Sequence, residues 1–241
     1  MRKKNEQFSA IAPCDTRSYS DCLRFSSGCA EIDKMETAAK QHLTTQEYLA
    51  IERNAEIKSE FLDGEMFAMA GGTRRHSRIK VKLIGALEQR LSGSPCQVLD
   101  SDMRVKIEAT GLYTYPDVSV ACGDLRFEDE REDTLLNPKL IVEVLSDSTA
   151  AWDRGEKFWH YRQLQSLLEY VLVSQDILIE HYTRQSDDTW LLETVQDRDA
   201  ILQLKSIKCS VPLAEIYEAD ERSSSRTPSK RQPLTKRSPK R

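Results

Sequence analysis

A single acidic residue interrupts a strongly apolar stretch of the chain. Lys139–Leu145 reads Lys-Leu-Ile-Val-Glu-Val-Leu, in which Glu143 is the one carboxylate. A nearly continuous apolar run of this length is typical of a central strand that is buried on both faces. An ionised carboxylate in such a place is costly unless it is paired or binds a metal. Glu143 is therefore a candidate metal ligand or general base, and a buried ion pair or a strand-end position is the structural alternative.

A second carboxylate lies in a comparable setting. Tyr115–Ala121 is a strand-like run in which Asp117 and Ser119 share one face, opposite the valines at 118 and 120. On its own, Asp117 is equally compatible with a turn next to Pro116. Together with Glu143 it forms a candidate pair of hard oxygen ligands on two neighbouring strands. Mg²⁺ favours such sites, with one or two carboxylates and retained waters, and Mn²⁺ is a second candidate.

A cation follows the Glu143 strand. Lys157 lies in the segment Trp152–Phe158, which opens a predicted helix. A lysine at this place can point back over the end of the sheet, where it would position a nucleophilic water and offset developing negative charge. The alternative is an ordinary i, i+4 surface pair with Asp153, which would contribute only about 0.3–0.5 kcal/mol.

These residues need a sheet and helices to bring them together. Thr44 followed by Glu47 is typical of a helix start, and Asp63-Gly64 between apolar residues predicts a tight hairpin turn. Helical spacing of apolar residues predicts a long helix over 73–91 and a second over 153–165. Strands are expected at about 96–107, 114–122, 139–145, 168–174, 177–184 and 189–195. The order predicts an α/β fold with a mixed sheet and helices packed on it.

Charge divides the chain of 241 residues, whose formal net charge is −4. Residues 222–241 hold eight basic residues and no acid, so we expect a disordered basic tail that contacts nucleic acid in a salt-dependent way, or a terminal extension without such a role. Without this tail the net charge is −12. Residues 1–35 lack sustained periodicity and are expected to be a disordered or non-native arm. The folded domain is then predicted to span 36–221.

The composition also sets the expected surroundings. The six cysteines are scattered, without a Cys-x-x-Cys pair, so we expect reduced thiols rather than a disulfide scaffold or a zinc site. No apolar stretch approaches the length of a membrane span, and no apolar segment follows the basic N-terminus as in a secretory signal. We therefore expect a cytoplasmic protein without membrane contact.

Several motifs together resemble a known family. Pro116-Asp117 followed by Glu143 resembles the split signature of the PD-(D/E)xK nuclease superfamily, and the wider chain over about 40–218 resembles the Uma-two family of restriction-like endonucleases. The motifs that carry the family resemblance are Glu60-Phe-Leu-Asp-Gly-Glu65, His76, Tyr115-Pro-Asp-Val118, Asn137-Pro-Lys139, Glu143-Val-Leu-Ser146, Thr149, Asp153-Arg-Gly-Glu-Lys157 and Tyr161.

The resemblance implies a restriction-endonuclease-like fold, whose core runs helix, three strands, helix, strand, here with extra flanking strands. It further implies cleavage of a phosphodiester by an activated water with Mg²⁺ held by Asp117 and Glu143. Leu145 stands where the superfamily has its usual lysine, two residues after the acid. The family resemblance implies that Lys157, on the following helix, takes the role of that lysine.

Three further residues are weaker candidates. Glu60 is a candidate for a further catalytic carboxylate, although a glutamate beside an Asp-Gly turn is also ordinary strand chemistry. His76 would contact phosphate or tune a carboxylate, unless it is a helix-surface histidine. Tyr161 lies one turn after Lys157 and is a hydrogen-bond partner of the site or a core residue.

Two function classes follow from these observations. The first is a metal-dependent endonuclease that acts on DNA, with a homodimer expected by analogy with enzymes that cut both strands. The second is a nuclease-fold protein that binds nucleic acid or a protein partner without cutting, because Leu145 stands where the lysine belongs and the body is acidic. A weaker third hypothesis is a hydrolase or toxin that acts on another phosphate ester.

Overall fold

The computed structural model describes residues 42–217. The expected N-terminal arm at 1–35 and the basic tail at 222–241 lie outside the described residues, as do the outermost residues of the predicted domain, so these limits stay predictions. Within residues 42–217, no helix combines the length and the apolar character needed to cross a membrane.

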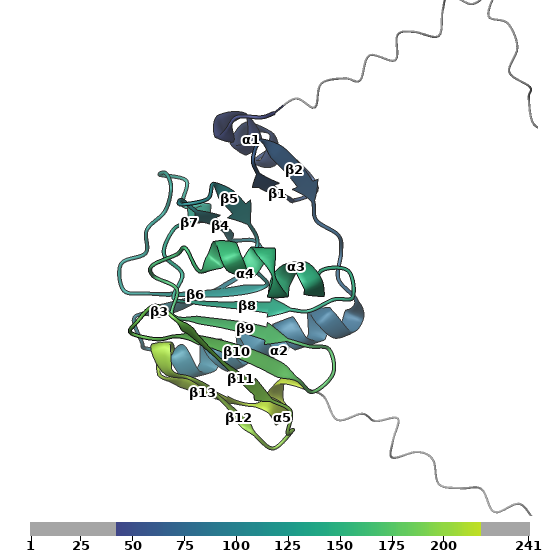
Figure 1. Ribbon diagram of the computed structural model, residues 1–241, viewed down its shortest axis with the longest axis vertical. Helices are drawn as coiled ribbons and strands as arrows, with labels where there is room; N and C mark the ends of the chain where they lie inside the picture. The colour runs from purple at the N-terminus through teal and green to yellow at the C-terminus, as the bar shows by residue number, and fades with distance from the viewer. Residues whose placement is uncertain (1–41, 218–241) are drawn as a thin grey trace, which may run out of the picture. The chain divides into compact units, whose positions relative to one another are not determined.

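A six-stranded sheet forms the centre of the described chain (Figure 1). Its strands run in the order β11-β10-β9-β8-β6-β3, and β8 and β9 are parallel while the other neighbours are antiparallel. The bounds of these strands are β3 Cys96–Asp100, β6 Val118–Cys122, β8 Leu140–Val144, β9 Glu169–Val173, β10 Ile179–Arg184 and β11 Trp190–Val195. The predicted mixed sheet is therefore confirmed.

Helices cover both faces of this sheet. α2 (Arg74–Leu91) packs Ile79, Leu83 and Leu87 against one face, where its neighbours include alternate residues of β6 and β8. α3 (Ala150–Arg154) and α4 (Glu156–Tyr161) lie on the opposite face (Figure 1). Because the central strands are covered on both sides, their side chains are apolar on both faces, which is the pattern that predicted burial.

A second sheet stands beside the first and was not predicted. Its strands run in the order β2-β1-β5-β4-β7. Their bounds are β1 Ser59–Leu62, β2 Glu65–Ala68, β4 Arg104–Ile107, β5 Leu112–Thr114 and β7 Thr134–Leu135. α1 (Thr45–Glu52) packs on this sheet through Tyr48, which stacks on Phe61.

Two predicted strands are each divided between the two sheets. The continuous strand expected at 96–107 is wrong, because a turn at 101–103 ends β3, and the chain enters the second sheet as β4. The strand expected at 114–122 is interrupted at 115–117, where Pro116 cannot donate a ladder hydrogen bond. Asp117 therefore lies at the passage from one sheet to the other.

The single helix expected over 153–165 is also wrong. The chain forms two short helices that are separated at Gly155, where φ is −107° and ψ is −99°. The C-terminal elements β12 (Ile201–Leu204), η1 (Lys205–Ile207), β13 (Cys209–Pro212) and α5 (Leu213–Ile216) were not predicted. The helix start at Thr44 is confirmed by a capping box with Glu47, and the hairpin turn by positive φ at Asp63 and Gly64.

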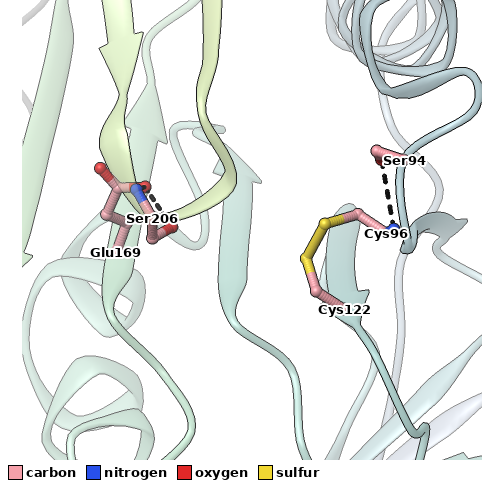
Figure 2. Close-up of a disulfide and its surroundings, with 5 residues drawn as sticks. All are labelled: Ser94, Cys96, Cys122, Glu169 and Ser206. Carbon is pink, nitrogen blue, oxygen red and sulfur yellow. Dashed lines mark hydrogen bonds between the residues drawn. A yellow bond between two sulfur atoms is a disulfide. The ribbon is translucent and has the colours of Figure 1, made fainter.

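The expectation that all six cysteines are reduced is wrong. A disulfide joins Cys96 at the start of β3 to Cys122 at the end of β6 (Figure 2). The two residues are direct partners in the antiparallel register, with their Cα atoms 3.9 Å apart. A sequence separation of 26 residues gave no sign of this pairing, because register between strands decides which cysteines meet.

Glu169 ties the central sheet to the C-terminal elements. Its side chain accepts hydrogen bonds from the backbone N–H and the hydroxyl of Ser206 (Figure 2). It also accepts one from the backbone N–H of Lys205. His181 Nε2 lies 3.3 Å from Oε1 of the same carboxylate. Burial alone would raise the pKa of Glu169, but these donors outweigh it and hold the pKa below its usual value.

We predict that Glu169→Gln lowers the free energy of unfolding by about 1.5–3 kcal/mol at neutral pH, since hydrogen bonds to a charged acceptor are lost. Because the pKa of Glu169 is lower in the folded state, its contribution is present at neutral pH and is lost as the pH falls through the acidic range. Urea unfolding from neutral to acidic pH should therefore show a smaller decline for the variant than for the wild type. Glu193→Gln, at an exposed position on β11, is the control; equal declines in all three proteins would contradict the prediction.

Candidate active site

The two predicted carboxylates come together at one end of β6 and β8. Val118 pairs with Val142 in the antiparallel register, so Asp117, one residue earlier, lies opposite Glu143. Two hydrogen bonds join them: the Asp117 N–H donates to Glu143 Oε2 at 3.2 Å, and the Val144 N–H donates to Asp117 Oδ2 at 2.8 Å. The strand register, rather than a loop, therefore fixes their relative position.

Asp117 faces basic groups of α2. His76 Nε2 lies 3.1 Å from Asp117 Oδ2, and Lys80 Nζ lies 3.7 Å from Oδ1. Burial would raise the pKa of Asp117, but the hydrogen bond and charge of His76, with help from Val144 and Lys80, lower it overall. Asp117 is therefore held as a carboxylate.

His76 is held in place from two sides. Its backbone N–H donates to the Thr73 side chain, which caps α2, and its ring packs against Gly72. A Cβ at Gly72 would lie only 2.9 Å from His76 Nδ1, so a larger residue would displace the ring. Of the two interpretations from sequence, His76 is thus a partner of Asp117 rather than a surface histidine.

Glu143 points toward α4. Its Oε1 atom accepts a hydrogen bond from the Tyr161 hydroxyl at 2.9 Å and lies 2.8 Å from Lys157 Nζ. The residue is only 4% exposed. Burial raises the pKa of Glu143 to about 8, although the charge of Lys157 acts in the opposite direction. Tyr161, fully buried, is both a core residue and a hydrogen-bond partner of the site.

Lys157 is enclosed by three carboxylates. Besides Glu143, its ammonium lies 3.2 Å from Glu60 Oε1 on β1 and 3.7 Å from Asp153 Oδ1 on α3. The Thr114 hydroxyl on β5 also donates to Glu60. Burial would lower the pKa of Lys157, but the neighbouring carboxylates raise it well above its usual value. The i, i+4 pair with Asp153 exists, but it is buried and not on the surface.

All four predicted catalytic residues line one cavity of about 940 Å³. Glu60, Asp117, Glu143 and Lys157 share this lining with His76 and with the segments 67–73 and 144–150. Leu145 packs in the apolar core under α4 and also lines the cavity, but a leucine brings no charge to the position two residues after Glu143. Lys157 supplies it from the neighbouring helix.

Two residues of the site were not among the predicted site residues. Asp153 is 3% exposed and faces Lys157, and burial raises its pKa. Lys80 is the second basic neighbour of Asp117 and donates to Ser101 Oγ at 2.9 Å. The sequence could have indicated Lys80, because it lies four residues after His76 and residues four apart share one face of a helix.

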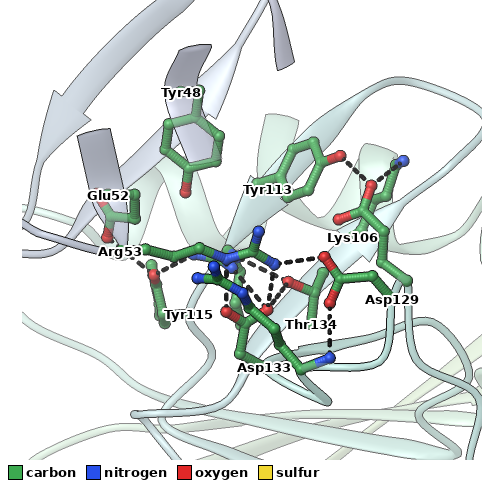
Figure 3. A network of polar contacts seen from close by, with 12 residues as sticks. Tyr48, Glu52, Arg53, Lys106, Tyr113, Tyr115, Asp129, Asp133 and Thr134 are labelled. Carbon is green, nitrogen blue, oxygen red and sulfur yellow. Dashed lines mark hydrogen bonds and ion pairs between the residues drawn. The ribbon is translucent and has the colours of Figure 1, made fainter. Parts of the chain in front are cut away.

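A largely buried polar network anchors residues 115–117, the segment between β5 and β6 that carries Asp117 (Figure 3). The Tyr115 hydroxyl donates to Glu52 Oε1 at 2.8 Å and accepts from Arg104 at 3.0 Å. Arg104 in turn bonds Asp133 at 3.0 Å, and Arg53 bonds the same carboxylate at 2.8 Å and 2.9 Å. Hydrogen bonds from Arg53 are the largest cause that lowers the pKa of Asp133 to about 2. The network fixes Tyr115 two residues before Asp117.

The carboxylate pair fits a small hard cation. Each carboxylate has one oxygen that is firmly held, Oδ2 of Asp117 and Oε1 of Glu143, and one with weaker contacts at 3.7 Å and 3.2 Å. Within residues 42–217, no group of three or more His, Cys, Asp and Glu side chains is arranged to hold a metal. The donor set is thus two carboxylates, which suits Mg²⁺ with retained waters rather than a closed protein cage.

A family model and two curated proteins match most of the described chain. The model of the Uma2 family, described as "Putative restriction endonuclease", matches residues 45–214. Two uncharacterized proteins of Synechocystis sp. are similar: sll1609 is 36% identical over 72% of this chain and 99% of its own length, and slr1290 is 41% identical over 73% and 91%.

A solved structure shares the fold. A "putative nuclease belonging to DUF820" from Anabaena variabilis aligns with a TM-score of 0.58 and 16% identity, over 72% of this chain and 97% of that one. At this identity the likeness concerns the fold alone. Together with the order α2, β3, β6, β8, α3–α4, β9, it confirms the predicted restriction-endonuclease-like fold.

We predict unequal losses of stability when the two members of the buried pair are replaced. Lys157→Met should lower the free energy of unfolding by about 3–5 kcal/mol, because the carboxylates around it lose their cation. Glu143→Gln should lower it by less, because burial raises the pKa of Glu143 and so makes its charged form less favourable than that of Lys157. Urea unfolding at neutral pH measures both, with Lys157→Arg as the variant that keeps the charge. A loss for Glu143→Gln as large as that for Lys157→Met would contradict this account.

Proposed function

Because the chain belongs to the Uma2 family, we propose that it is a metal-dependent endonuclease that hydrolyses phosphodiester bonds of DNA. The observation that carries the proposal is the position of Lys157. Its ammonium is buried within 2.8 Å of Glu143 and lines the same cavity as Asp117. Buried charged groups with shifted pKa values that gather at a cavity are typical of active sites.

Asp117 and Glu143 would hold Mg²⁺ or Mn²⁺ through the oxygens that have weaker contacts. When bound, the metal lowers the pKa of a coordinated water and offsets negative charge on the phosphate. His76 and Tyr161 would orient the two metal ligands. His76 donates a hydrogen bond to Oδ2 of Asp117, and Tyr161 donates one to Oε1 of Glu143, so the second oxygen of each carboxylate is left for the metal. Donors of this kind orient metal ligands and commonly change affinity by about 10–100-fold when they are removed.

Lys157 faces the cavity and orients the attacking water, while Glu60 and Asp153 keep its charge in place. The water oxygen forms a bond to phosphorus as the bond from phosphorus to the leaving oxygen breaks. The attacking water gives one proton to bulk solvent, and the leaving oxygen takes one proton from bulk solvent to end as a hydroxyl, so that protons balance over the reaction. The negative charge that builds on the phosphate in this step is offset by the ammonium of Lys157.

Cleavage of plasmid DNA tests the proposal. We predict nicking in the presence of Mg²⁺ or Mn²⁺, and a loss of at least about 100-fold in Asp117→Asn and in Glu143→Gln, because each removes a metal ligand. Asp124→Asn removes the same charge at an exposed site outside the cavity and serves as the control. Metal-dependent nicking that persists unchanged in the two cavity variants would contradict the assignment of the ligands.

The same assay separates the two function classes. Folded wild-type protein that binds DNA but does not cut plasmid or single-stranded DNA with either metal would favour the non-catalytic protein. Single-stranded and double-stranded substrates, each as DNA and RNA, then define which nucleic acid the cavity accepts.

The basic tail at 222–241 adds a separate proposal, because its eight basic residues would neutralise phosphates without regard to sequence. Deletion of 222–241 should weaken binding to duplex DNA and reduce the dependence of log Kd on log salt by about 0.9 for each phosphate that the tail no longer neutralises. Fluorescence anisotropy over a salt series measures this slope. Binding that survives the deletion unaltered would count against a role of the tail.

A further inference from the structure

The helix α2 carries a charge opposite to that of the whole chain. Its 18 residues include six lysine or arginine residues and one glutamate, a net charge of +5. The full chain has a net charge of −4, and without the basic tail it is −12. A polyanion would be repelled by most of this protein, so its approach depends on where basic side chains gather.

The basic residues of α2 divide between its two sides. His76 and Lys80 are turned inward to Asp117. Arg74, Arg78 and Lys82 are exposed and follow one another at intervals of four residues, so they form a stripe along the outer side. We call these three residues the α2 basic face. At about 1.5 Å rise per residue, the stripe is about 12 Å long.

The α2 basic face begins at the rim of the cavity. The cavity that holds the candidate active site is lined by Thr73, which caps α2, and by Arg75 and His76 in the first turn of the helix. Arg74 lies between them in sequence, at the start of the stripe. A ligand that leaves the cavity at this rim would therefore meet the basic face first.

The N-terminus of α2 carries positive charges, whereas helices usually favour negative charges there. Its first turn holds Arg74 and Arg75 and no acidic residue, although the positive end of a helix favours acidic ones. Arg75 has a partner in Asp176 at 3.2 Å. An anion bound at this end would relieve the unfavourable charge.

The outer side of α2 is also open to close approach. Gly85 lies three residues after Lys82 on the same side, and a Cβ there would meet no atom within 4 Å. A glycine inside a helix costs about 1 kcal/mol relative to alanine, and local crowding does not explain it. The helix carries no aromatic residue, whereas protein interfaces are usually anchored by aromatic side chains.

We propose that the α2 basic face binds the sugar-phosphate backbone of the nucleic acid substrate on its way to the cavity. The inference rests on the proposed nuclease function and adds where the substrate lies. Arg74, Arg78 and Lys82 contact successive phosphates, and the strand reaches Asp117 and Glu143 around the start of α2. Contacts of this kind position a substrate and are independent of its sequence.

The test is binding of a fluorescein-labelled DNA duplex to the full-length protein in EDTA, so that no cleavage occurs. The variant is the triple change Arg74→Gln, Arg78→Gln and Lys82→Gln. The control carries the same loss of charge at three exposed positions outside α2: Arg126→Gln, Arg131→Gln and Lys205→Gln. Circular dichroism checks that both triple variants are folded.

We expect the α2 variant to bind about 10–100-fold more weakly, and its slope of log Kd against log salt to fall by about 2–3, over a range of about 50–200 mM salt. The control variant should stay close to the wild type. Equal losses in both variants would show an effect of net charge alone and overturn the inference, as would unchanged binding of the α2 variant. If the wild type does not bind DNA at all, the inference is wrong, and an acidic protein surface becomes the partner to test.

Cleavage by the same variants separates this inference from the proposed function. If the wild type cuts DNA, the α2 variant should show a raised KM with kcat retained, because the changed residues lie outside the cavity. A wild type that binds through α2 without cutting would support the inference and contradict the nuclease. If the wild type cuts DNA and the α2 variant has the same KM and the same affinity as the wild type, the nuclease is supported and the inference about α2 is contradicted.

Discussion

The ammonium of Lys157 is enclosed by carboxylates from three separate elements, and the arrangement of the site depends on it. Glu143 comes from the central strand β8, Glu60 from β1 of the second sheet and Asp153 from α3. Three acids gathered around one buried position would repel strongly without a cation among them. Lys157 therefore joins the two sheets and the helical layer at the point where the cavity forms.

The two carboxylates that we propose as metal ligands are oriented by different helices. Each carboxylate has a protein donor on one oxygen, from His76 on one face of the sheet and from Tyr161 on the other. Because the donors come from α2 and α4, both helical layers must be in place before the ligands are oriented. In the proposed function the remaining oxygens bind a cation, and a polyanionic substrate would then need a basic surface outside the acidic cavity.

Sequence alone predicted the parts of the site that depend on strand patterns. Glu143 was conspicuous because its neighbours are apolar, and Asp117 because it precedes an alternating strand. Lys157 could be placed only by resemblance, since spacing cannot tell a buried i, i+4 pair with Asp153 from a surface one. The break at Gly155, which ends α3 before Lys157, was likewise invisible to a helical pattern.

The errors in the fold have a common physical cause. Apolar periodicity reports that a residue is buried but not which sheet buries it, so β3 and β4 read as one strand, and β5 and β6 as another. Cys96 and Cys122 meet through the register of β3 and β6, which no local pattern encodes. Lys80 was missed because its partner Asp117 is distant in sequence and on another element.

We propose that Asp117 and Glu143 form a metal site, in which the ammonium of Lys157 lies against Glu143. Crystals of the wild-type protein grown with Mn²⁺ and measured for its anomalous scattering test it directly. The account predicts an anomalous peak that contacts a carboxylate oxygen of each residue, and no such peak in crystals of Asp117→Asn. A well-ordered cavity without a peak between the two carboxylates, or Mn²⁺ bound there with the same occupancy in the variant, would contradict it.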